Sequence, residues 1–164
     1  MVKKIKCYFD KSGVQFLSLK IYKDKRGHLL KALEKESIRK KIKDIYISKS
    51  KKNVFRGLHY NNLINELRYY ICIQGKFLHY FYDMRKKSKT YKKLKFFTNS
   101  KNNIIIMLTS GIAHGVLSLK DNSLLLCLNT AKFNQKKEKN IFYEKAGIKL
   151  SKKIILSRKD RDFK

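Results

Sequence analysis

Short apolar runs, rich in β-branched and aromatic residues, recur along almost the entire chain. They occupy residues 14–22, 44–48, 53–60, 67–75, 76–84, 92–98, 103–108, 113–119, 123–129 and 152–157. Asn, Asp, Ser, Gly and Lys residues separate the runs, and short runs bounded in this way are typical of β-strands. Many short strands in one chain build a sandwich or a barrel. The sequence therefore predicts an all-β fold.

One segment departs from this pattern. In residues 28–45, Leu29 and Leu33 lie on one face and good helix formers fill the gaps, which predicts one short N-terminal helix. Gly75 stands between two runs and predicts a tight hairpin, because glycine adopts a positive φ without strain. The chain shows no internal repeat and no linker, so residues 1–164 are expected to form a single domain.

The chain is strongly basic, because 41 Lys and Arg residues stand against 12 Asp and Glu residues and give a formal net charge of +29. Such a charge attracts anions, and a sugar nucleotide is an anion as much as DNA is. The lysines are spread along the chain in pairs that flank the apolar runs, as on a solvated surface. We therefore do not expect a nucleic-acid partner from the charge alone.

Cysteine spacing and hydropathy bear on the compartment. Cys7, Cys72 and Cys127 are widely spaced and form no CxxC pair, which indicates reduced thiols. No apolar stretch has the length of a signal peptide core or of a membrane span. We expect a cytoplasmic protein with no membrane partner.

Five motifs occur in a characteristic order: YKDKRGHLL (22–30), VFRGLHY (54–60), GKFLHYFYDMRKKSKTY (75–91), TSGIAHGVLSLKD (109–121) and ILSRKD (155–160). Together they resemble the dTDP-4-dehydrorhamnose 3,5-epimerase family over nearly the whole chain. The resemblance implies a cupin-type jelly-roll barrel, a homodimer, and catalysis without a metal or redox cofactor. That fold agrees with the strand pattern.

The implied activity is epimerisation at C3, C5 or both of a nucleotide-diphosphate-linked 4-keto-6-deoxy sugar, in surface polysaccharide or deoxysugar biosynthesis. Protons beside the C4 ketone are acidic, and inverting such a centre needs a base on one face and an acid on the other. Stabilisation of the enolate completes the requirement. A histidine suits the base, since its unperturbed pKa is about 6.5.

The resemblance assigns this chemistry to residues of the chain. His59 of RGLHY corresponds to the base, and Asp160 of SRKD corresponds to its pairing carboxylate. Arg68 replaces the family's enolate-stabilising lysine and keeps its positive charge, and His114 of AHG matches a further catalytic position.

The substrate-binding assignments rest on the same resemblance. Arg56 and Arg26 are expected to hold the diphosphate, because a planar guanidinium binds phosphate oxygens in pairs. Asp83 matches a further site position, although it could instead pair with Arg85 or cap a turn. Tyr46 falls on a nucleotide-binding position where the family has another residue, so the nucleotide base is left open.

The family's proton-donating tyrosine falls on Cys127 in this chain. A positioned cysteine can deliver a proton, whereas a cysteine in an apolar strand is more often packing, and we favour packing.

The spacing of Arg56 and His59 predicts an irregular strand. Residues three apart in a regular strand face opposite sides, so Arg56 and His59 can enter one cavity only if the strand bulges, and Gly57 is the expected position.

Three alternatives stay open on the sequence. The first is a non-catalytic jelly roll that binds anions or nucleic acid through its lysines. The second is a 3,4-ketoisomerase of a related sugar nucleotide, which would share the proton abstraction. The third is a metal-dependent cupin. The sequence has no HxH motif, and His59, His79 and His114 are scattered along the chain, so no metal site is predicted.

Overall fold

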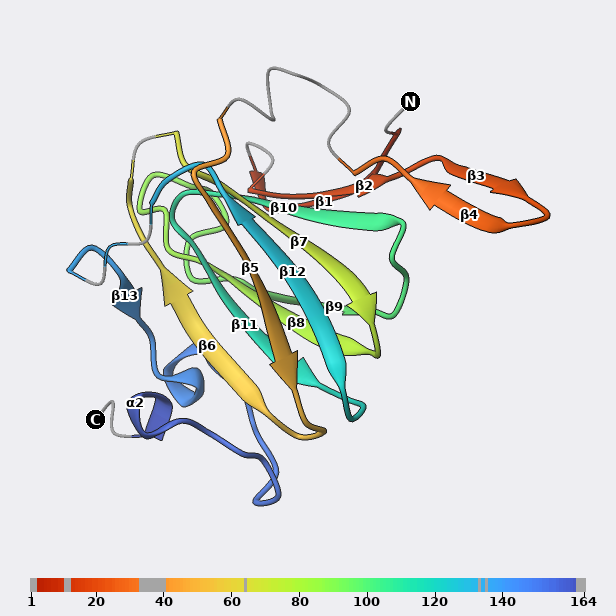
Figure 1. Ribbon diagram of the computed structural model, residues 1–164. Helices are drawn as coiled ribbons and strands as arrows, with labels where there is room; N and C mark the ends of the chain where they lie inside the picture. The colour runs from red at the N-terminus through yellow and green to blue at the C-terminus, as the bar shows by residue number, and fades with distance from the viewer. Residues whose placement is uncertain are drawn as a thin grey trace.

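The computed structural model describes residues 3–10, 13–32, 41–63, 65–132, 134 and 136–161. Strands dominate it, as predicted, and most of them stack as two sheets (Figure 1). The six-stranded sheet has the order β1 (Lys3–Tyr8), β2 (Val14–Ser18), β10 (Ile104–Thr109), β7 (Leu67–Gln74), β12 (Ser123–Asn129) and β5 (Asp44–Ser50). The five-stranded sheet has the order β13 (Lys139–Asn140), β6 (Phe55–Tyr60), β11 (Ile112–Ser118), β8 (Phe77–Asp83) and β9 (Leu94–Asn99).

The chain crosses between the two sheets repeatedly. Strands β5, β7, β10 and β12 lie in the six-stranded sheet, and the strand that follows each of them along the chain lies in the five-stranded sheet. Pairing within both sheets is antiparallel. Antiparallel strands that alternate between two packed sheets form a jelly roll. The prediction of an all-β jelly roll is therefore confirmed.

The turn at Gly75 corrects the prediction of a hairpin. Gly75 has the expected positive φ, at +86°. The strands that it joins, β7 and β8, nevertheless lie in different sheets and do not pair with each other. A Cβ atom at Gly75 would lie only 2.2 Å from the Ser123 hydroxyl oxygen, so glycine lets the turn close against the start of β12. The sequence identifies a tight turn but not which sheet receives the next strand.

The predicted helix over residues 28–45 is wrong at both ends. Its first residues belong to β4 (Gly27–Leu30), which pairs with β3 (Ile21–Asp24) in a two-stranded ribbon that projects from the sandwich (Figure 1). Its last residues begin β5, where β-branched side chains alternate with polar ones. Residues 33–40 lie outside the described residues.

Towards its C-terminal end the chain leaves the sheets. It forms the 3-10 turn η2 (Tyr143–Ala146) and the helical turn α2 (Arg158–Arg161). In the described part of the chain, the strand predicted over residues 152–157 reduces to one parallel bridge between Val54 and Ile155. In the described ranges, no helix is both long enough and apolar enough to cross a membrane.

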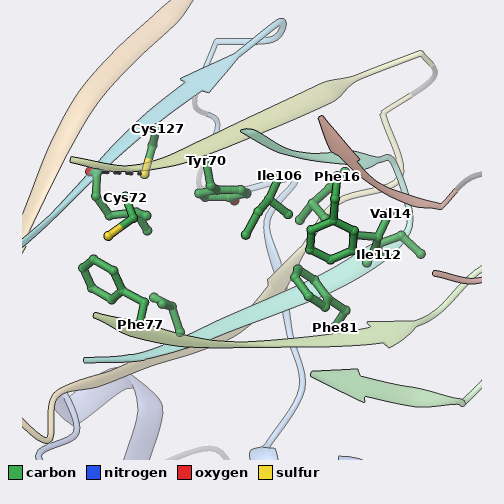
Figure 2. Packing of buried hydrophobic residues seen from close by; sticks show 12 residues of the cluster. Val14, Phe16, Tyr70, Cys72, Phe77, Phe81, Ile106, Ile112 and Cys127 are labelled. Atoms are coloured by element: carbon green, nitrogen blue, oxygen red, sulfur yellow. Dashed lines mark hydrogen bonds between the residues drawn. The ribbon is translucent and has the colours of Figure 1, made fainter. Parts of the chain in front are cut away.

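The apolar core lies between the two sheets, where inward residues of facing strands meet (Figure 2). Phe16 on β2 and Phe81 on β8 are almost completely buried, and their rings meet edge to face with centroids 6.1 Å apart. Burial of such a side chain stabilises a fold by about 1.5–3 kcal/mol. Tyr70 and Cys127 belong to the same cluster and also line the cavity described below.

A second apolar cluster ties the C-terminal segment to the outer face of the five-stranded sheet. Ala146 and Ile148 pack there with buried residues of that sheet, including Leu58 on β6. The segment then returns along the sheet edge, so that α2 lies beside β6 (Figure 1). This packing allows Asp160 on α2 to contact His59 on β6, 101 residues earlier in the chain.

Strand β6 contains the predicted bulge. Its residues His59 and Arg56 pair with His114 and Val116 of β11, so two residues of β6 stand against one of β11 between these pairs. Gly57 has a φ of +127°, which favours glycine. The bulge turns Arg56 and His59 to the same cavity, and both line it. The prediction that the strand is irregular at Gly57 is confirmed.

Replacing Gly57 by Ala is expected to destabilise the protein more than replacing Gly27 by Ala. Both glycines have a similar positive φ, at +127° and +131°, so each substitution carries a backbone cost of about 1–3 kcal/mol. A Cβ at Gly57 would also lie 2.5 Å from the Gly115 Cα, whereas one at Gly27 meets nothing within 4 Å. Overpacking of this kind adds about 1–3 kcal/mol. Urea unfolding of both variants measures the difference, and equal losses would contradict the account of the bulge.

Candidate active site

A cavity of about 790 Å³ opens between the two sheets. Strands β5, β7 and β12 form one wall, β6 and β11 form the facing wall, and the segment around α2 closes one side. Small-molecule sites have volumes of about 300–1,000 Å³. Seven of the nine predicted site residues line this cavity. They are Tyr46, Arg56, His59, Arg68, His114, Cys127 and Asp160.

The centre of the site is a hydrogen-bonded pair of His59 and Asp160. The Nε2 atom of His59 lies 3.1 Å from Oδ1 of Asp160. Since a carboxylate only accepts, this contact puts the imidazole proton on Nε2 and leaves the lone pair on Nδ1. The Ser157 hydroxyl donates to the other carboxylate oxygen at 2.8 Å. These two hydrogen bonds fix the orientation of both side chains.

The Asp160 carboxylate is buried yet remains charged. Burial by itself raises the pKa of Asp160. The hydrogen bonds from His59 and Ser157 and the charges of His59 and Lys159 act in the opposite direction, and the net pKa lies below its usual value. A charged carboxylate at this position stabilises a positive charge on the imidazole.

A second carboxylate lies beside His59, and sequence reasoning did not identify it. The Oε1 atom of Glu138 lies 3.9 Å from Nδ1 of His59, and its Oε2 atom accepts from Nζ of Lys159 at 2.6 Å. Glu138 stands in a lysine-rich stretch that is typical of a solvated loop, so nothing local marks it. Glu138 therefore places a second carboxylate near the imidazole, on the side of Nδ1, whereas Asp160 contacts Nε2.

Two arginines supply fixed positive charge. Arg56 is exposed at the cavity, where it donates to the Ser50 hydroxyl at 3.3 Å and to the Lys49 carbonyl at 3.4 Å. Arg68 is buried and donates to the main-chain carbonyls of His59, at 3.3 Å, and Ile112. Its Nε has no hydrogen-bond partner in the described part of the chain. Arg68 is therefore held rigidly next to the histidine's main chain.

His114 forms part of the same wall as His59, and a second buried histidine lies behind it. The Nε2 atom of His114 is 3.0 Å from Nδ1 of His79, a residue that does not line the cavity. The ring of Tyr70 packs on His114 with centroids 4.2 Å apart. The described residues contain no group of three or more His, Cys, Asp or Glu side chains that could hold a metal ion.

The facing wall presents two phenols and a thiol. Cys127 pairs with Tyr46 on β5 and with Tyr70 on β7, so the three residues lie in one row across the sheet. Burial raises the pKa of Cys127 to about 12 and that of Tyr70 to about 12. Burial likewise raises the pKa of Tyr46, next to Tyr70 and Cys127. Cys127 is 2% exposed and packs in the core, which agrees with the packing interpretation.

Asp83 and Arg26 lie outside this cavity. The Asp83 side chain is fully buried, pairs with Arg85 at 2.7 Å, and accepts hydroxyl hydrogen bonds from Ser88 and Thr90. The pairing with Arg85 that the sequence left open is therefore what the structure shows. Arg26 lies at the exposed tip of the projecting ribbon and pairs with Asp24 at 2.6 Å. Neither residue lines the cavity of its own chain.

The rim of the cavity is basic. Lys49, Lys132, Lys137 and Lys159 line it together with Arg56. Such a concentration of positive charge around a concave site raises the local concentration of anions. The site therefore combines an anion-attracting rim, a histidine–carboxylate pair and phenols on the opposite wall.

Comparisons with known proteins agree with this arrangement. A family model described as dTDP-4-dehydrorhamnose 3,5-epimerase matches residues 10–164. A dTDP-4-dehydrorhamnose 3,5-epimerase from Mycobacterium tuberculosis is 27% identical over 140 residues, which are 80% of this chain and 69% of that protein. A dTDP-4-dehydro-6-deoxyglucose 3-epimerase from Streptomyces bikiniensis is 24% identical over 129 residues, 74% of this chain and 66% of that protein.

A solved structure extends the likeness to the fold. It is that of a dTDP-6-deoxy-D-glucose-3,5-epimerase from Legionella pneumophila in complex with dTDP-4-keto-L-rhamnose. The TM-score is 0.84 at 22% sequence identity, and the match covers 98% of this chain and 90% of that one. The fold is thus the cupin-type jelly roll that the motifs implied.

Replacing Asp160 by Asn is expected to lower the free energy of unfolding by about 1–3 kcal/mol at neutral pH, because hydrogen bonds to a buried charge are lost. The folded-state pKa of Asp160 is depressed, so its contribution is present above the usual Asp pKa of about 3.9 and is lost as the pH falls through the folded value. The gap between wild type and variant should therefore shrink in acid.

Urea unfolding at several pH values measures this gap. Asp24→Asn is the matched control, because Asp24 is half exposed on the ribbon and should give little change. A gap for Asp160→Asn that does not shrink as the pH falls below about 4 would contradict the assignment of a charged Asp160.

Proposed function

Because the chain belongs to the dTDP-4-dehydrorhamnose 3,5-epimerase family, we propose that it epimerises a nucleotide-diphosphate-linked 4-keto-6-deoxy sugar by proton abstraction at His59. The observation that carries this proposal is the contact of His59 with the buried Asp160 inside a cavity large enough for a hexose. The relatives are named as epimerases that act on one or on two carbons of such sugars. Which carbons react here is left to experiment.

In the first step His59 takes the proton from a carbon beside the C4 ketone. Its Nδ1 lone pair is free to do so because Nε2 donates to Asp160. The C–H electron pair moves into the enolate, and His59 becomes an imidazolium when it accepts the proton. Asp160 and Glu138 stabilise that imidazolium, so the abstraction does not create an unpaired buried charge.

The enolate oxygen needs donors or positive charge that are already in place before the reaction. Arg68 offers a guanidinium fixed by two carbonyl contacts, and its Nε has no partner in the described ranges. His114 lies on the same wall as His59 and presents its ring to the cavity. Preorganised groups of this kind stabilise developing charge without reorganising during the reaction.

Inversion requires that a proton returns from the face opposite His59. His59 belongs to the five-stranded sheet, whereas Tyr46, Tyr70 and Cys127 belong to the six-stranded sheet across the cavity. Of these three, Tyr46 is 47% exposed, and Tyr70 and Cys127 are almost completely buried in the core. A tyrosine has an ordinary pKa of about 10 and so keeps its proton at neutral pH. Tyr46 is therefore assigned as the donor, because it is the phenol of this wall that a bound sugar can reach.

The substrate's diphosphate is assigned to Arg56 and the lysines of the rim. Arg56 is exposed at the same cavity as His59, and its planar guanidinium matches phosphate oxygens. The related Legionella enzyme is in complex with dTDP-4-keto-L-rhamnose, which has the same diphosphate and ketone. The nucleotide base of this chain's own substrate is left open, since Tyr46 departs from the family pattern.

We also expect a homodimer, as the family resemblance implies. The ribbon of β3 and β4 projects from the sandwich and exposes Tyr22 and Leu29. Arg26 at its tip does not reach the cavity of its own chain. A role for Arg26 in binding the diphosphate therefore depends on delivery of this ribbon to a second copy.

The central test is incorporation of deuterium from solvent into dTDP-4-keto-6-deoxyglucose, which NMR detects. The UDP- and GDP-linked forms of the same sugar are tested in parallel. Wild-type protein is expected to label C3, C5 or both. His59→Gln should slow labelling by at least about 100-fold, because general-base catalysis contributes roughly 10²–10⁴-fold. Lys145→Gln, which is exposed and does not line the cavity, is the control and should label normally. A folded wild-type protein that labels none of these sugars would contradict the proposal.

Tyr46→Phe separates the donor from the base. Removal of the phenol should leave labelling at the reacting carbon, since His59 is intact, but should slow formation of the inverted product by about 100-fold or more. Tyr91→Phe, outside the cavity, controls for loss of a phenol as such. Epimerisation at the wild-type rate in Tyr46→Phe would show that Tyr46 is not the proton donor.

A further inference from the structure

His79 is the one histidine that is completely buried and takes no direct part in the proposed reaction. It lies on β8 directly behind His114, with ring centroids 5.3 Å apart and planes 20° apart. Phe81 stacks on both rings. The Nδ1 atom of His79 and the Nε2 atom of His114 are 3.0 Å apart, which requires one proton between them.

The pair can hold this proton in two ways. If His114 donates from Nε2, a neutral His79 must carry its own proton on Nε2. That atom is buried and has no hydrogen-bond partner in the described part of the chain, so it would be an orphaned N–H donor. If His79 donates from Nδ1, its Nε2 is instead an unfilled acceptor. Orphaned buried N–H groups are the rarer of the two in proteins.

We propose that His79 is a positioning residue that fixes His114 in the tautomer with its proton on Nδ1, as a neutral hydrogen-bond donor to the substrate's ketone oxygen. Because Nε2 of His114 accepts from His79, the remaining ring proton must lie on the nitrogen that His79 does not occupy. His114 lines the cavity and His79 does not. The proposal deepens the function proposed above and rests on it.

The surroundings of the pair favour two neutral rings. Burial lowers the pKa of His79 to about 3. Burial, His79, and the positive charges of Arg68 and His59 hold the pKa of His114 well below its usual value. A neutral N–H donor polarises a carbonyl without placing a further cation beside Arg68 and the protonated His59. His59 and His114 thus share a wall and have opposite roles, one as acceptor of a proton and one as hydrogen-bond donor.

The first test needs no substrate. Nitrogen-15 NMR of histidine-labelled wild-type protein, with His114 assigned by its loss in His114→Gln, reports which ring nitrogen carries the proton. We expect a protonated Nδ1 and a bare Nε2 at neutral pH. A proton on Nε2 of His114, or on both nitrogens, would overturn the proposal whatever the enzyme's activity.

The second test uses two side chains of equal size at position 79. The amide of His79→Gln can donate to Nε2 of His114 and preserve its tautomer, whereas the carboxylate of His79→Glu can only accept and reverses it. We expect His79→Glu to lower kcat by about 10–100-fold with little change in KM, as for other residues that orient a catalytic group. His79→Gln should lose much less.

The two tests distinguish failure of this proposal from failure of the proposed function. Equal losses of kcat in both variants, or no loss in either, would assign His79 to packing alone. If His79→Glu does not fold, the wild-type spectrum still decides. A wild-type protein could show the expected tautomer of His114 and yet exchange no proton of any sugar nucleotide tested. That result would contradict the epimerase proposal and would not contradict the proposed tautomer.

Discussion

The hydrogen bond between His59 and Asp160 joins parts of the chain that are 101 residues apart. It depends on the C-terminal segment, which packs Ala146 and Ile148 against the outer face of the five-stranded sheet and so carries α2 to the cavity. The bulge at Gly57 adds Arg56 to the same side of the strand as His59, which a regular strand would not do. The environment of the His59 imidazole therefore depends both on the local backbone of β6 and on the packing of the C-terminal segment.

The jelly roll divides the chemistry between two facing sheets. The five-stranded sheet carries His59 and His114, and the six-stranded sheet carries Arg68, Tyr46 and Tyr70. In the proposed reaction, a sugar ring bound between them would meet His59 on one face and Tyr46 on the other. Part of the net charge of +29 lies at this cavity, where lysines line the site to which we assign an anionic substrate.

Much of this site could be predicted from the sequence, since its motifs carry residue identity and order. His59, Asp160 and the bulge at Gly57 followed from the motifs and from strand geometry. The sequence could not say that the turn at Gly75 crosses between sheets, because periodicity reports a strand's faces and not its neighbours. The resemblance places Asp83 at a site position and leaves pairing with Arg85 open, and the structure shows Arg85, Ser88 and Thr90 as its partners.

The positions of two further residues at the site could not be predicted, because they depend on tertiary packing. Glu138 lies in a lysine-rich stretch that reads as solvated loop, yet its carboxylate approaches His59 to 3.9 Å. His79 alternates with core residues along β8, and that pattern does not show which side chain it contacts. In the structure it contacts His114 instead of the cavity.

The most direct measurement is a crystal structure of the protein with a dTDP-linked 6-deoxyhexose that lacks the ketone and cannot react. We expect the sugar ring between the two sheets, with Nδ1 of His59 within about 3–3.5 Å of C3 or C5 and the diphosphate on Arg56. A nucleotide bound outside this cavity, or a sugar whose reacting carbons face away from His59, would contradict the central claim.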